Sequence, residues 1–119
     1  MEGRKFRGTA ITLDDGREVV VPALPVGLER DHQAEIRAAQ VASKRFQETK
    51  EGDPEFLEAK AQASETMARV AIFALHLNHP EITLADLLAT QSAQTIIALY
   101  AAAFWRRAGG GGAGEAASP

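Results

Sequence analysis

Residues 96–105 form an unbroken run of apolar and aromatic side chains near the end of a chain of 119 residues. As a helix this run would rise only about 15 Å, against a hydrocarbon core of about 30 Å, so we do not expect it to span a membrane. Its apolar side chains would point in all directions, which requires cover on every side. A chain of this length has one domain with a limited core, so we expect deep burial of this helix or cover by another molecule.

The charged residues are concentrated in the first half of the chain. Residues 1–60 hold ten of the thirteen Lys and Arg residues and twelve of the sixteen Asp and Glu residues. We therefore expect a well-solvated first half and a second half that supplies most of the core or an interface. The formal net charge of −3 gives no basic face for nucleic acid. The absence of cysteine excludes a disulfide scaffold and a thiolate metal site.

Residues 6–22 are predicted to form a β-hairpin. Thr9, Ile11 and Leu13 alternate onto one face, as they would in a strand. Residues 14–16, Asp-Asp-Gly, form a turn signal because glycine tolerates a positive φ. The valines at 19–21 favour a second strand, and Pro22 ends it because proline lacks the N–H that a ladder needs.

The rest of the domain, residues 28–107, is predicted to be helical. A polar helix is expected over about residues 28–50, with an apolar edge of Ile36, Ala39, Val41, Ala42 and Phe46. Asp53 and Pro54 are typical of a helix start, here over residues 54–76. Thr83 and Asp86 match a capping box at the start of a short helix, and a last helix is expected over residues 92–107. The predicted fold class is mainly α with a small N-terminal β-hairpin (α+β), in a compact bundle of about four helices.

Two apolar faces are candidates for a partner-binding surface. In the helix over residues 54–76 apolar side chains recur every three or four positions, and the last helix is apolar all round. The predicted partner-binding residues are Met67, Val70, Ala74, Leu77, Ile96, Leu99, Tyr100, Phe104 and Trp105. Residues 1–107 are expected to form a single domain, and the Gly- and Ala-rich residues 108–119 a flexible tail.

The sequence carries no pattern for catalysis, a metal or a cofactor, and we predict a protein that is not an enzyme. His76 and His79 have a spacing that two metal ligands can share, but zinc needs a third and usually a fourth ligand. We expect them instead to interact with carbonyl groups at the end of a helix. Residues 84–100 resemble a helix-turn-helix in outline, although the second helix offers an apolar wall where base contacts are needed.

The order of these segments resembles the tail assembly chaperones of long-tailed phages and Mu-like prophages. In that family a β-strand pair ending in Val-Pro-x-Leu precedes a helical body, and Val21, Pro22 and Leu24 match this motif. A segment Pro-x-Ile-Thr-x-x-Asp/Glu-Leu then opens the final helices, and Thr83, Asp86 and Leu87 match it. The resemblance covers about residues 9–105, and the charged middle, residues 28–62, does not align.

The resemblance implies a protein that binds the tape measure protein, helps to recruit tail tube subunits, acts in the host cytoplasm and is absent from the mature virion. It implies no cofactor and no membrane or nucleic-acid partner, and it leaves a homo-oligomer open. Two alternatives also remain open. The first is a small structural tail or head-completion subunit of the virion. The second is a helix-turn-helix DNA-binding regulator.

Overall fold

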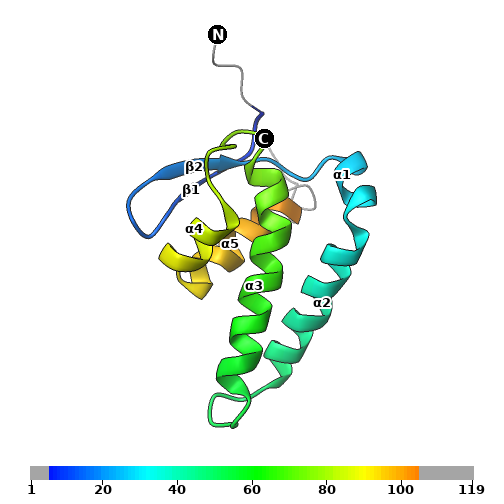
Figure 1. Cartoon of the computed structure of the whole chain (residues 1–119), viewed down its shortest axis with the longest axis vertical. Coiled ribbons are helices and arrows are strands. Elements are labelled where there is room, and N and C mark those ends of the chain that lie inside the picture. Colours follow the sequence, from blue (N-terminus) through cyan, green and yellow to red (C-terminus); the bar gives the residue numbers. More distant parts are fainter. Residues whose placement is uncertain (1–5, 105–119) are drawn as a thin grey trace.

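The computed structural model describes residues 6–104, which form a two-stranded hairpin followed by five helices (Figure 1). Strand β1 (Thr9–Thr12) pairs antiparallel with β2 (Glu18–Val21), so that Thr9 lies opposite Val21. Between them Gly16 adopts a φ of 94°, as the Asp-Asp-Gly signal predicts. The predicted mainly α fold with a small N-terminal hairpin is confirmed, with five helices where about four were expected.

The hairpin buries one face against the helices. Leu13, Val19 and Val21 are buried, whereas Ala10 and Thr12 on the opposite face are exposed. Gly8 lies so close to β2 that a Cβ there would be 2.2 Å from the carbonyl oxygen of Val21. Only glycine permits this close approach of the two backbone segments.

The polar helix predicted over residues 28–50 is in fact two helices. Helix α1 (Val26–Asp31) and helix α2 (Gln33–Glu48) meet at His32, whose φ of −120° and ψ of 33° are not helical. The imidazole of His32 stacks on the ring of Phe73, with centroids 3.7 Å apart and planes inclined by 10°. This contact links the bend at His32 to the helix that carries Phe73.

Helix α3 (Phe56–Leu75) begins later than predicted. The Asp53 carboxylate accepts a hydrogen bond from the backbone N–H of Lys50, at 2.9 Å. It therefore stabilises the turn before the helix and does not cap the helix itself. The helix is capped at Glu55 without a side-chain hydrogen bond, and the predicted N-cap at Asp53 is wrong.

Helix α4 (Leu84–Thr90) and helix α5 (Ala93–Phe104) follow as predicted within the described residues. The Thr83 hydroxyl accepts a hydrogen bond from the backbone N–H of Asp86, at 3.0 Å, which confirms the threonine cap. The described helices include none with the length and apolar character that a membrane crossing requires.

The described chain has two parts that differ in packing, which we call the body and the arm. The arm, residues 33–66, comprises α2, the following loop and the amino-terminal half of α3. The body comprises the other described residues. In Figure 1 the loop of the arm lies at the end of the molecule far from the hairpin, while α4 and α5 lie beside α3 nearer the hairpin.

Candidate protein-interaction surface

Most of the predicted partner-binding residues lie inside the core of the body. Six are buried by the chain itself, namely Met67, Val70, Ala74, Ile96, Leu99 and Tyr100. Leu77 and Phe104 are half-buried, and Trp105 lies outside the described residues. A buried side chain cannot contact a partner while the domain stays folded, so we do not assign partner binding to these six residues.

Helix α5 buries five of its residues against other elements of the body, whereas Ala98 is exposed. Helix α3 packs along α5, and the small residues Ala68 and Ala71 are among those that α3 buries. On another side the backbone N–H of Leu24, just after the hairpin, donates to the carbonyl oxygen of Ala103 at 2.8 Å. Of the two arrangements expected from the sequence, deep burial and cover by another molecule, the structure shows the first for the five buried residues of α5. Burial also raises the pKa of the Tyr100 hydroxyl.

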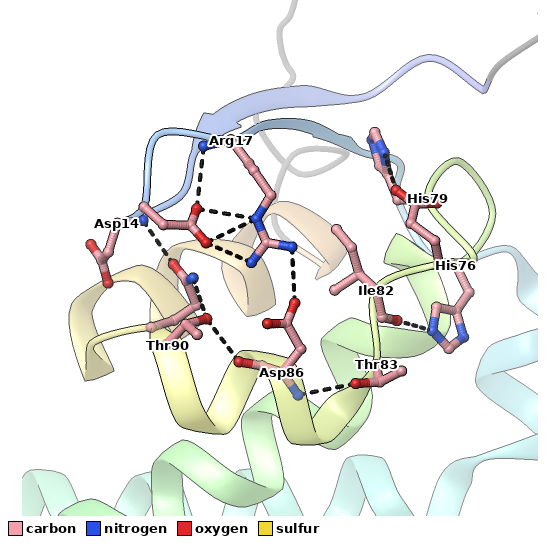
Figure 2. A network of polar contacts seen from close by, with 11 residues as sticks. Asp14, Arg17, His76, His79, Ile82, Thr83, Asp86 and Thr90 are labelled. Carbon is pink, nitrogen blue, oxygen red and sulfur yellow. Dashed lines mark hydrogen bonds and ion pairs between the residues drawn. The ribbon is translucent and has the colours of Figure 1, made fainter.

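The hairpin turn is tied to the junction between α4 and α5 by polar contacts (Figure 2). The Asp14 carboxylate accepts hydrogen bonds from the backbone N–H of Ser92 and, at 2.8 Å, from the hydroxyl of Thr95. The backbone N–H of Asp14 donates to the buried side chain of Gln91, also at 2.8 Å. The bond from Ser92, followed by the bond from Thr95, lowers the pKa of Asp14.

Arg17 joins the turn to α4 directly. Its guanidinium lies 2.8 Å from a carboxylate oxygen of Asp15 and 2.9 Å from one of Asp86. The hydrogen bond from Arg17 lowers the pKa of Asp15, and both carboxylates raise the pKa of Arg17. Asp86 therefore contacts the hairpin, whereas the sequence pattern predicted that it would complete a capping box.

A second set of polar side chains holds the other end of the hairpin. The buried Asn78 amide accepts from the backbone N–H of Phe6 at 2.7 Å, and it donates to the carbonyl oxygens of Phe6 and Val20 at 2.9 and 3.0 Å. His79 Nε2 accepts from the backbone N–H of Val20 at 3.0 Å. These contacts fix the strands onto the end of α3.

The two histidines that could have shared a metal ion have separate structural contacts. His76 Nε2 is hydrogen-bonded to the carbonyl oxygen of Ile82 (Figure 2), and His79 Nε2 accepts from the backbone N–H of Val20 in the hairpin. Across residues 6–104 the structure holds no cluster of three side chains suited to binding a metal. The sequence predicted contacts of both histidines with carbonyl groups at a helix end, but the carbonyl that His76 contacts lies in the loop between α3 and α4, and His79 accepts from a backbone N–H.

Large apolar side chains are exposed on both parts of the described chain, namely Phe6, Val26 and Leu88 on the body and Val41 and Leu57 on the arm. Val41, which the sequence predicts on an apolar edge of the helix, is 64% exposed, and Leu57 on α3 is 73% exposed. Val41 lies in a shallow groove of about 440 Å³ between α2 and α3, lined by Ala34, Arg37, Ala38, Val41, Ala42, Arg45, Gln62 and Thr66. On α2 these positions recur every three or four residues, so they form one stripe along the helix.

This surface was not predicted from the sequence, although part of the apolar pattern on α2 was visible there. Ala34, Ala38 and Val41 have helical spacing, but the sequence alone does not show which face of α2 meets α3. Comparison with protein-family models, with curated proteins and with solved structures finds no match for the chain.

Proposed function

We propose that this protein is a tail assembly chaperone of a long-tailed phage or Mu-like prophage. In this role it binds the tape measure protein and helps to recruit tail tube subunits in the host cytoplasm, and it leaves before the virion is complete. The observation that carries the proposal is the open apolar stripe on α2 around Val41. Such a stripe can shield an apolar helix of a client protein from water.

Two further features support the proposal. The order of a short hairpin followed by helices is the layout that the sequence resemblance implies. The arm also extends away from the well-packed body, so a client helix can lie on α2 without opening the core (Figure 1). A chaperone that must release its client benefits from a separate surface, because binding and release then leave its own fold intact.

The test is co-expression of the chain with the tape measure protein of the phage or prophage that encodes it. We expect the chain to copurify with that protein and to keep it in the supernatant after centrifugation. Val41→Asp replaces the apolar side chain of the stripe by a carboxylate and should reduce the copurified amount about tenfold, because the carboxylate would have to lose its water when an apolar helix packs on it. Val26→Asp is the matched control, since Val26 is 77% exposed on α1 outside the groove.

Two outcomes would contradict the proposal. The first is a tape measure protein that stays equally soluble with and without the chain. The second is the chain in purified virions by mass spectrometry at the level of a structural component, which would favour the alternative of a tail or head-completion subunit.

A further inference from the structure

The charged residues that line the groove are of one sign. Arg37 and Arg45 are the charged residues among those that line it, in a chain whose formal net charge is −3. Along α2 they lie on either side of Val41, and eight residues of helix correspond to about 12 Å. The groove therefore has an apolar centre with a cation toward each end.

These two arginines also differ from others on the surface. Arg17, Arg30 and Arg69 each lie within ion-pair distance of a carboxylate. Within residues 6–104, Arg45 instead donates to the side-chain oxygen of Gln62 at 2.8 Å, and Arg37 has no ion pair. Both guanidinium groups are thus available to carboxylates from outside the described chain.

We propose that the groove binds an amphipathic helix of a partner protein whose apolar stripe carries Asp or Glu at its flanks. Alanines at 34, 38 and 42 give the groove a floor of small side chains, on which large aliphatic side chains of a partner helix can rest. Acidic residues about two turns apart on that helix would then reach Arg37 and Arg45. This inference rests on the proposed protein-binding role, and it does not depend on the partner being a tape measure protein.

The same charges argue against a second copy of this chain as the occupant. A two-fold pair formed through the groove would bring one surface against its own copy. Arginines of both copies would then share one interface without a carboxylate among the groove residues, and like charges in an interface are unfavourable.

The experiment compares two labelled helical peptides, each of about 18 residues, or five turns. They share one apolar stripe and differ only in having Glu or Lys at the flanking positions. Fluorescence anisotropy with the full chain should show the Glu peptide binding about tenfold more tightly than the Lys peptide, with the difference decreasing at high salt.

Charge-reversed variants test the role of the two arginines. The double variant Arg37→Glu with Arg45→Glu should reverse the preference in favour of the Lys peptide. The control Arg7→Glu with Arg30→Glu changes the net charge equally at exposed positions outside the groove and should leave the preference unchanged. Circular dichroism checks the helical content, and Arg37→Gln with Arg45→Gln, which should abolish the preference, replaces the reversed variant if that one fails to fold.

Several results would overturn the inference. They are no binding of either peptide, equal binding of both, a preference that the double variant leaves unchanged, or a dimer in light scattering that Val41→Asp converts to a monomer. If the Glu peptide binds as expected while the tape measure protein does not copurify, the proposed function fails and the groove assignment stands. If the tape measure protein copurifies while the Glu peptide does not bind as expected, only the groove assignment fails.

Discussion

The body and the arm are held together by different kinds of side chain. In the body the largest fully buried residues are leucines and valines, namely Leu75, Leu87, Leu99, Val19, Val21 and Val70. In the arm every buried residue is an alanine, namely Ala39, Ala42, Ala59 and Ala63. Alanine lets α2 and α3 approach closely but buries little apolar area. The body therefore supplies most of the stability, and the arm supplies an accessible helical surface.

The contrast between Leu99 and Val41 gives the largest predicted effect. Leu99→Ala should lower the free energy of unfolding by about 2–5 kcal/mol, because it leaves a cavity in the body. Val41→Ala on the arm should change it by less than about 0.5 kcal/mol, because the side chain is mostly exposed. Denaturation by urea measures both. Equal effects would mean that the arm and the body are not packed as described.

The aspartate variants Leu99→Asp and Phe104→Asp extend this test. Both residues are among the partner-binding positions that the sequence predicts. The burial of Leu99 now predicts loss of the fold for the first, which circular dichroism would detect. Phe104 is half-buried, so its variant should retain more helix than that of Leu99.

Amide hydrogen exchange should divide the molecule along the same boundary. We expect backbone amides in α5 to exchange only through global unfolding, and those in α2 through local opening that costs at least about 2 kcal/mol less. The reason is that α2 buries only Ala39 and Ala42, whereas α5 has five buried residues. Equal protection of both helices would show that the arm and body unfold as one unit.

Asn78→Ala should have an intermediate effect within the body. It removes three hydrogen bonds to the hairpin and leaves backbone groups of Phe6 and Val20 without that partner. We expect a loss of about 1–3 kcal/mol in the free energy of unfolding. The amides of β1 and β2 should lose more exchange protection than those of α2. A loss confined to the arm would contradict the role given to Asn78.

The smallest effect concerns the turn of the hairpin and depends on pH. The folded-state pKa of Asp14 lies below its ordinary value of 3.8, because its carboxylate accepts hydrogen bonds from Ser92 and Thr95. Its stabilising contribution is therefore full above that value and is lost as the pH falls through the folded-state pKa. Asp14→Asn should slightly lower the thermal midpoint near neutral pH, and the difference from wild type should shrink in acid. A difference that is constant over this range would contradict the assignment.

Features that depend on neighbouring residues were predictable from the sequence. The Asp-Asp-Gly turn, the strand end at Pro22 and the Thr83 cap are set by backbone conformations and hydrogen bonds within a few residues. The helical periodicity around Val70 also identified the side of α3 that is buried, since apolar spacing reports a face directly. The resemblance to tail assembly chaperones rests on these same local motifs.

Features that depend on which elements meet were decided by the tertiary structure alone. Asp86 pairs with Arg17 across the fold, and Val41 is exposed because α2 turns a neighbouring face toward α3. The last helix packs against α3 and the hairpin. An apolar pattern shows that a side chain favours burial, but it does not identify the surface that buries it. Leu99 and Val41 are both aliphatic residues on predicted apolar faces, and only the packing of the helices makes one core and the other surface.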